Sequence, residues 1–399
     1  MSLSLFLLFL SVWLNYIDRG SLSVAAPQLS RELSLEPQQM GFLLSAFFWT
    51  YTLFQIAAGW LVDRYDVVKV YGAGLALWSV ATALSGYSTG FATLFACRLL
   101  LGIGESVAFP SYTKILQQAY PEHERGFANA MVDVGTKAGP ALGTFLAGML
   151  TVGYGWRTMF IALGAASAIW LIPWFFFAPN SRGFTKRPAG GPGLGAIAKL
   201  EIAWATFLGL LCYNYAFYFL LTWLPSYLVN ERKFTQTMMS VYAALPFAVT
   251  AIASLVAGKL SDRRIAAGEP AADVRRRFLV VGLVIGAVCL PAATVENNVV
   301  AMVLLVAAFV GIGITTSNLW ALTMTIAGPA ASQWTGLQNA VGNMGGVIAP
   351  VITGFIVKET GSFHLAFFGA AGMLLLSALI YGVWMRGAGP VRWPGAASS

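Results

Sequence analysis

Charged residues are scarce in this 399-residue chain: Asp, Glu, Lys and Arg together make up 10%, whereas an ordinary soluble domain carries about 25%. Hydrophobic residues make up 58%. Apolar runs of about 20 residues recur, and each is long enough to cross the ~30 Å hydrocarbon core of a bilayer. This composition excludes a soluble globular domain and predicts a helical membrane protein with many spans.

Cysteine and histidine are also scarce. The three cysteines, Cys97, Cys212 and Cys289, lie apart in apolar segments, so we expect them to pack as small hydrophobic residues rather than to form disulfides. The two histidines, His123 and His364, are too few for a His-based metal site. Because no nucleophile–base pair or cofactor motif is present either, we expect no enzyme activity, no metal and no cofactor.

Basic residues outnumber acidic ones by 24 to 16, which gives a net charge of +8. Such a charge could indicate nucleic-acid binding, but its placement favours a membrane topology instead. With the N-terminus in the cytoplasm, 16 of the 24 basic residues fall in cytoplasmic loops and the C-terminal tail, five on the opposite side and three inside helices. This bias places both termini in the cytoplasm, and we expect no nucleic-acid partner.

Pro, Gly and charge clusters divide the apolar sequence into separate helices. The first segment lacks the basic n-region of a signal peptide, so we expect it to remain as the first span. The predicted fold is an all-α membrane protein with twelve transmembrane helices in two pseudo-symmetric bundles of six. The helices are expected near residues 4–28, 38–62, 68–88, 90–114, 123–150, 154–178, 200–228, 236–260, 276–296, 299–326, 332–358 and 362–385.

The second half of the chain repeats the first. We therefore expect bundles at 1–178 and 200–399, joined by a cytoplasmic linker at 179–199 that is rich in Gly, Pro and basic residues. Two such halves suit a transporter that rocks about a site at the membrane midplane. A channel would favour an oligomer around one pore, so we expect a monomer in the lipid bilayer. Five residues match at a constant offset of 210: Gly126, Asn129, Ala130, Gly135 and Pro140 fall on Gly336, Asn339, Ala340, Gly345 and Pro350.

Four motifs resemble those of a known family. GWLVDR (59–64) with Lys69, its echo GKLSDRR (258–264) and RLLLGIGESVAFP (98–110) are similar to signatures of the major facilitator superfamily. NYIDRGSLSVAAP (15–27) resembles helix 1 of its anion:cation symporter branch, which includes bacterial sugar-acid permeases and animal vesicular glutamate and sialic acid carriers. Members of that branch mostly move organic anions with protons, so the resemblance implies such a transporter in a bacterial inner membrane. It also implies cytoplasmic gating loops that contain Asp63, Arg64, Asp262 and Arg263.

Six charged residues lie inside predicted helices of the first half, and each would cost roughly 2.5–3.5 kcal/mol at a helix centre. They carry three charges of each sign, so we expect them to pair or to face a watery cavity. Arg98 and Glu105 are two turns apart, ~10.5 Å along one helix, so each should meet another helix. The six are Asp18, Arg19, Arg98, Glu105, Asp133 and Lys137.

The adjacent Asp18 and Arg19 point ~100° apart on a helix, so they should serve different neighbours. The planar guanidinium of Arg19 suits a substrate carboxylate; the alternative is a purely structural pair. The family resemblance implies that Glu105 and Asp18 bind the coupling proton; for Glu105 the alternative is an architectural network with Arg98. An acid that loses its cationic partner in low dielectric takes up a proton, so substrate binding at Arg19 would drive protonation.

On the fifth predicted helix, Asp133 and Lys137 are spaced i,i+4 and can neutralise each other. Alternatively, Lys137 presents a second cation to the substrate. Asp133 and Arg98 are also candidates for the proton-coupling group. Thr136 stands where related sugar-acid permeases have Gln, and this departure favours a dicarboxylate or a smaller acid.

Further polar and aromatic residues are candidates for substrate binding. Tyr16 and Tyr51 match tyrosines that line the site of sugar-acid permeases, and Ser317, Trp320 and Asn339 match residues of the second half. Asn214, Tyr215 and Asn318 are candidates only because they are predicted to lie deep in the membrane. The alternative for each is ordinary packing between helices.

The sequence therefore predicts a proton-coupled symporter of an organic anion that works by alternating access. The anion is a sugar acid such as a hexonate or hexuronate, or a related carboxylate. An exchanger or facilitator without proton coupling is the nearest alternative, and an anion channel or sensor is a third.

Overall fold

The computed structural model describes residues 3–119, 122–180, 193–292, 294–391 and 393. These residues form helices and contain no strand. The helices of the first half are α1 (Leu3–Glu32), α2 (Pro37–Arg64), α3 (Val67–Ser85), α4 (Phe91–Ser106), α5 (Ala108–Ala119) and α6 (Glu122–Phe177). Those that follow are α7 (Leu194–Ala198), α8 (Glu201–Asn230), α9 (Gln236–Ala266), α10 (Ala271–Ala292), α11 (Asn298–Ala327), the short 3₁₀ turn η2 (Gly328–Ala330), α12 (Ala331–Thr360), α13 (His364–Leu379) and the π-helical turn η3 (Ile380–Trp384).

The predicted helices are present, with three local differences. The fourth is divided into α4 and α5 at Val107, and the short α7 lies inside the predicted linker. The fifth and sixth are joined in α6, which changes direction at Gly155. There φ is 81° and ψ is 162°, a conformation that only glycine adopts without strain. Eight stretches of the described residues are helices long and apolar enough to cross a membrane, and the all-α membrane fold is confirmed.

The chain forms two compact units. Unit 1 comprises Met1–Arg187, Phe219–Ala248 and Val347–Phe363, and unit 2 comprises Pro188–Tyr218, Val249–Gly346 and His364–Ser399. This division cuts across α8, α9 and α12. It therefore differs from the division into 1–178, 179–199 and 200–399, which stays a prediction.

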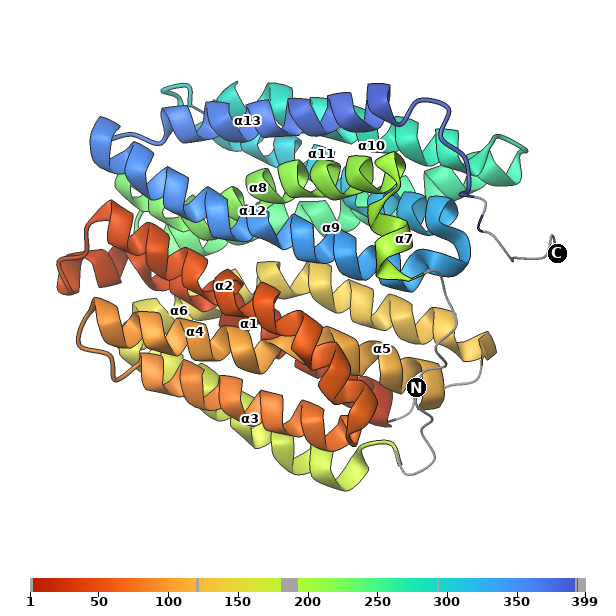
Figure 1. Cartoon of the computed structure of the whole chain (residues 1–399). Helices are drawn as coiled ribbons and strands as arrows, with labels where there is room; N and C mark the ends of the chain where they lie inside the picture. Colours follow the sequence, from red (N-terminus) through yellow and green to blue (C-terminus); the bar gives the residue numbers. More distant parts are fainter. Residues whose placement is uncertain (1–2, 120–121, 181–192, 293, 392, 394–399) are drawn as a thin grey trace. The chain divides into compact units, whose positions relative to one another are not determined.

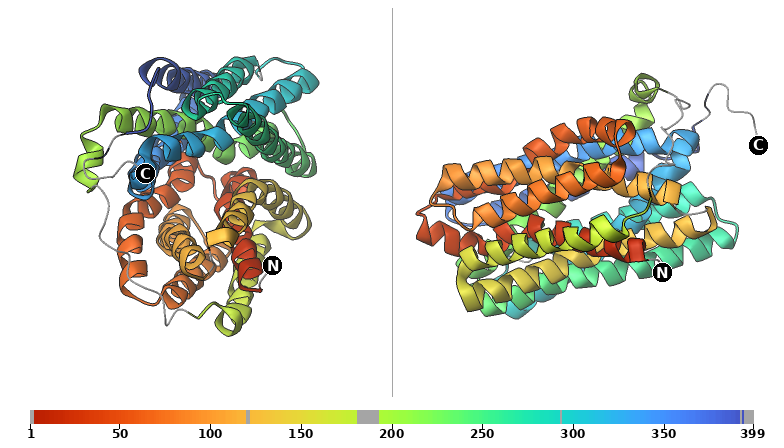
Figure 2. Two further views of the ribbon diagram at one scale, coloured as in Figure 1. Left: turned by 90° about the vertical axis from the view of Figure 1, so that its right-hand side faces the viewer. Right: turned by 90° about the horizontal axis from the view of Figure 1, so that it is seen from below.

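Close backbone contacts hold the helices of unit 1 together. The left view of Figure 2 looks roughly along its helices, and in Figure 1 α3 and α4 lie side by side, as their many contacts require. A Cβ atom built on Gly104 of α4 would lie 2.8 Å from the carbonyl oxygen of Gly74 on α3. Small residues at such crossings are typical of membrane helices, because association there depends on close van der Waals packing.

An aromatic cluster fills the space between α3, α5 and α6. Tyr71 is fully buried, and its ring centroid lies 5.1–6.1 Å from those of Trp78, Tyr112, Trp170 and Trp174. The contacts are mostly edge to face, an arrangement that aromatic rings favour. These large side chains form the core beside which α1 and α4 place their charged residues.

A second close contact in unit 1 joins α2 to the part of α12 within this unit. A Cβ atom on Gly354 would lie 2.6 Å from the carbonyl oxygen of Pro37, and one on Gly41 would lie 2.6 Å from that of Pro350. At the same end, Lys358 Nζ lies 3.0 Å from a carboxylate oxygen of Glu36.

Unit 2 uses the same device between α10 and α11. A Cβ atom on Gly311 would lie 2.5 Å from the carbonyl oxygen of Gly282. α13 also packs against α10. Beyond it, the hydroxyl of Tyr381 in η3 donates a 3.2 Å hydrogen bond to the carbonyl of Thr206 in α8.

Substitution of Gly104 by Ala should lower the free energy of unfolding by about 1–3 kcal/mol, because the new methyl group overpacks the α3–α4 contact. Gly372→Ala is the matched control, since a Cβ there meets no atom within 4 Å. Thermal unfolding of the purified protein in detergent measures both. An equal midpoint for Gly104→Ala and the wild type would contradict the close contact.

Candidate functional site

A buried ion pair joins α1 to α4 inside unit 1. Arg19 Nη2 lies 2.9 Å from Glu105 Oε2, and Arg19 Nε donates to the same oxygen at 3.2 Å. Glu105 is fully buried and Arg19 is 7% exposed. One turn earlier on α1, the Asn15 side-chain oxygen accepts a 3.3 Å hydrogen bond from Arg19 Nη2. Pairing lowers the cost of burying these two full charges inside unit 1.

Three aromatic rings surround the Arg19 guanidinium. Its central carbon lies 5.0 Å from the ring centroid of Tyr16, 4.7 Å from that of Phe47 and 4.8 Å from that of Tyr51. Phe47 and Tyr51 are one turn apart on α2 and stack at 5.0 Å. Such rings stabilise a desolvated cation. The structure thus brings Tyr16 and Tyr51 to Arg19, and it adds Phe47, which sequence reasoning missed although its i,i+4 spacing from Tyr51 pointed to the same face.

Asp18 faces different neighbours from Arg19. Its Oδ2 accepts a 2.8 Å hydrogen bond from the hydroxyl of Ser167 on α6. Its Oδ1 has no hydrogen-bond partner among the described residues, and the side chain is 1% exposed. No cation in the described part of the chain forms an ion pair with Asp18. Ser167 is a second residue that the sequence did not indicate, since one serine in an apolar helix is unremarkable.

Arg98 contacts the main chain of α1 rather than a carboxylate. Its Nη2 donates to the carbonyl oxygen of Arg19 at 3.1 Å, and Nη1 lies 3.5 Å from that of Asp18. The guanidinium is buried, and its Nε has no hydrogen-bond partner among the described residues. Arg98 therefore holds the backbone of α1 where that helix carries its two charges. Within the described residues, Arg98 and Glu105 form no ion pair.

A small cavity borders the two arginines within unit 1. Its volume is about 10 Å³, the space of a single water molecule. A sugar acid does not fit into this cavity. The lining residues are Arg19, Gly20, Ser23, Leu44, Phe48, Arg98, Leu221 and Thr222.

The candidates of the second half lie on α8, α11 and α12, in unit 2. Asn318 is buried and donates to the Ser317 hydroxyl at 3.1 Å and to the Ile314 carbonyl at 3.2 Å. Asn214 and Tyr215 are buried on α8, whereas Trp320 and Asn339 are partly exposed. One turn after Asn214, Tyr218 donates a 2.8 Å hydrogen bond to Asn343, a polar contact that sequence reasoning missed.

The structure describes the side chains of only some of the other predicted residues. The side chains of Asp133, Lys137 and Asp63 lie outside the described residues, so the predictions about them stay predictions. Thr136 is partly exposed on α6. Among the gating candidates, Arg64, Asp262 and Arg263 are all exposed; the Arg64 guanidinium lies 5.5 Å from the Trp60 ring.

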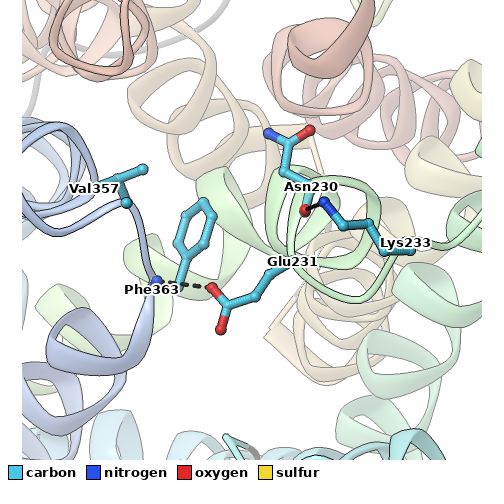
Figure 3. Close-up of a pocket in the computed structure, with 6 residues that line it drawn as sticks. Asn230, Glu231, Lys233, Val357 and Phe363 are labelled. Atoms are coloured by element: carbon cyan, nitrogen blue, oxygen red, sulfur yellow. Dashed lines mark hydrogen bonds between the residues drawn. The ribbon is translucent and has the colours of Figure 1, made fainter.

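Another cavity, of about 260 Å³, opens where α8 and α12 end. Figure 3 shows the Glu231 carboxylate directed at the main-chain nitrogen of Phe363, which donates to it at 2.8 Å. The ammonium group of Lys233 donates to the carbonyl of Asn230 at 2.6 Å. These charges bind nearby main-chain groups, and no predicted site residue lines the cavity, so we do not place the site there.

The sequence of this chain is similar to those of known transporters. Residues 8–332 match the sequence model of the Major Facilitator Superfamily. The chain is 32% identical to the probable sulfoacetate transporter of Cupriavidus necator, over 93% of this chain and 90% of that protein. It is 30% identical to the hexuronate transporter of Bacillus subtilis (93% and 92% covered) and to the D-galactonate transporter of Escherichia coli O6:H1 (95% and 94% covered).

Two solved structures have the same fold. Both are of a bacterial homologue of the human lysosomal transporter Spinster, with TM-scores of 0.82 and 0.81. The first covers 96% of each chain at 19% identity, and the second covers 96% of this chain and 97% of that one at 20% identity. Identities this low establish the shared fold only.

Removal of one partner of the buried ion pair should destabilise the protein. Glu105→Leu leaves the Arg19 charge unpaired, and arginine cannot release its proton, so we expect a loss of about 3–5 kcal/mol. The double variant Arg19→Met/Glu105→Leu removes both charges of this pair and should recover most of that loss. Thermal unfolding in detergent at one pH and salt concentration compares them; a double variant no more stable than Glu105→Leu would show that the pair is not the cause.

Proposed function

The chain belongs to the major facilitator superfamily, and we propose that it is a proton-coupled importer of a small organic anion that works by alternating access. It is a membrane-spanning transporter rather than an enzyme, and its relatives are named as transporters of sulfoacetate, galactonate and hexuronate. We place it in the inner membrane of a bacterium, with both termini in the cytoplasm.

One observation carries the proposal: Arg19 is a buried guanidinium whose one carboxylate partner among the described residues is Glu105. A substrate carboxylate suits the same planar fork. Two carboxylates cannot both keep that cation in a region of low dielectric. When the substrate takes Arg19, Glu105 is left as an unpaired buried acid and binds a proton instead. Substrate binding and protonation are thereby coupled.

Asp18 is the second proton site of the proposal. It is buried, it has one hydrogen bond from Ser167, and no described cation pairs with it. An ionised carboxylate in such surroundings is costly, whereas a neutral carboxyl group is not. Two protons moving with one monovalent anion would carry net positive charge inward, so the membrane potential would also drive import.

The contacts between α2 and α12 supply the gating part of the proposal. Gly41 and Gly354 let the two backbones meet, and Lys358 donates a 3.0 Å hydrogen bond to Gln38 as well as pairing with Glu36. In the proposed orientation this end of unit 1 is periplasmic. The contact is then a closed outer gate that must part for the substrate to enter.

Polar residues of the second half are candidates for binding the rest of the substrate. We keep Asn214, Tyr215, Ser317, Asn318, Trp320 and Asn339, together with Thr136 from the first half, as candidates for binding the hydroxyl groups of the anion, and Lys137 as a candidate second cation for its carboxylate. Their amide, hydroxyl and indole groups can hydrogen-bond an alcohol without adding charge.

An organic-anion exchanger without proton coupling is the second candidate. The same ion pair favours it, because an anion could displace Glu105 from Arg19 and later be displaced by another anion. The two functions differ only in whether Glu105 is protonated when it is released.

Uptake into proteoliposomes should separate these functions. Sulfoacetate, D-galactonate and D-glucuronate are supplied with and without an inward proton gradient, to the wild type and to Glu105→Gln. We expect the gradient to drive accumulation of at least one acid in the wild type. The variant should lose accumulation by tenfold or more and keep counterflow, because its neutral amide cannot release a proton. Counterflow that ignores the gradient in both proteins would establish the exchanger.

Substitution of Gly354 by Leu should prevent closure of the proposed outer gate. Uptake should fall at least tenfold while equilibrium binding of the transported acid persists; Gly369→Leu, where a Cβ meets no atom within 4 Å, is the control. Wild-type uptake by Gly354→Leu would contradict the gate.

Lys358→Gln should keep uptake within about fivefold of the wild type, because an exposed ion pair contributes only ~0.2–1 kcal/mol.

A further inference from the structure

Asn15 is a fully buried amide beside the ion pair, and it has no role in the mechanism proposed above. Its oxygen and the Glu105 carboxylate share one nitrogen, Arg19 Nη2, at 3.3 Å and 2.9 Å. Its own nitrogen, Nδ2, makes no hydrogen bond of good geometry among the described residues. Glu105 Oε1 likewise has no hydrogen-bond partner among the described residues, and the two side chains are neighbours because both bond Arg19 Nη2.

A buried polar atom without a partner is costly, typically by more than a made hydrogen bond contributes. Here two such atoms of opposite hydrogen-bonding type lie on adjacent groups: an N–H donor on Asn15 and a carboxylate acceptor on Glu105. The Asn15 oxygen and Glu105 Oε2 lie 3.3 Å and 2.9 Å from the same nitrogen, Arg19 Nη2. The two side chains are therefore close enough for a rotation of the Glu105 side chain to join them without a movement of the main chain.

A carboxamide has a property that few other side chains share: it presents a donor and an acceptor side by side. It can donate from Nδ2 to an ionised carboxylate. It can also accept at Oδ1 from the O–H of a protonated carboxyl while donating to the carbonyl oxygen of the same group. Asn15 can therefore form hydrogen bonds with Glu105 both before and after the acid binds a proton.

We infer that Asn15 is a positioning residue that receives Glu105 when the substrate displaces it from Arg19, and that it pairs with the protonated acid through two hydrogen bonds. Substrate binding frees Oδ1 from Arg19 at the moment when the Glu105 O–H needs an acceptor. The inference rests on the proposed function, because it requires that Glu105 becomes protonated.

Infrared difference spectroscopy in lipid tests the hydrogen bonds directly and needs no substrate. Acidification of the wild type should produce a carbonyl band of protonated Glu105, assigned by its absence from Glu105→Gln. In Asn15→Leu, which has nearly the same size and no polar atom, this band should move to higher wavenumber, because a carbonyl that loses a hydrogen bond vibrates faster. Ser11→Ala is the control: Ser11 is equally buried on α1 and bonds the carbonyl of Leu8.

Counterflow of sulfoacetate, D-galactonate and D-glucuronate gives the second measurement. For whichever acid is transported, Asn15→Leu should raise the half-saturating concentration about tenfold, equivalent to ~1.4 kcal/mol, and Ser11→Ala should not. A Glu105 band that appears but has the same wavenumber in Asn15→Leu would overturn the inference and leave the proposed function intact. Absence of any acid-induced Glu105 band in the wild type would overturn both.

Discussion

The ion pair between Arg19 and Glu105 is the interaction on which the rest of this structure depends. Each charge alone would be expensive inside a membrane, and together they are tolerable only with good geometry and extra partners. The protein supplies those partners from three helices: rings from α1 and α2, the Asn15 amide, and Arg98 holding the α1 backbone. Arg19 and Glu105 together carry no net charge, and in the proposed mechanism the substrate anion takes the place of Glu105.

Glycines bring two pairs of helices into backbone contact within unit 1. Gly74 and Gly104 lie where α3 meets α4, beside the ion pair. Gly41 and Gly354 make a similar contact, and the polar contacts at the rim of their crossing come from the Lys358 side chain, which bonds Glu36 and Gln38. Close packing without strong polar attraction forms a tight seal that can still separate, which is what a gate requires.

The sequence predicted the helices and the charged residues well, and their partners less well. Hydropathy and Gly or Pro positions marked the spans, and the scarcity of charge made Asp18, Arg19 and Glu105 conspicuous. Pairing was harder, because the spacing of Arg98 and Glu105 showed only that each meets another helix. Arg98 binds main-chain carbonyls, which every residue has and no sequence pattern reveals. Phe47 and Ser167 escaped notice because neutral residues of their kinds are common in membrane helices.

The Arg98 guanidinium contacts the main-chain carbonyl oxygens of Asp18 and Arg19. These contacts restrain the α1 backbone beside the ion pair, so Arg19 and Glu105 can change partners by rotating their side chains. Exposed side chains change rotamer in picoseconds to nanoseconds, and collective helix motions take about microseconds to milliseconds. A change of partner that is confined to side chains therefore need not wait for a movement of the helices.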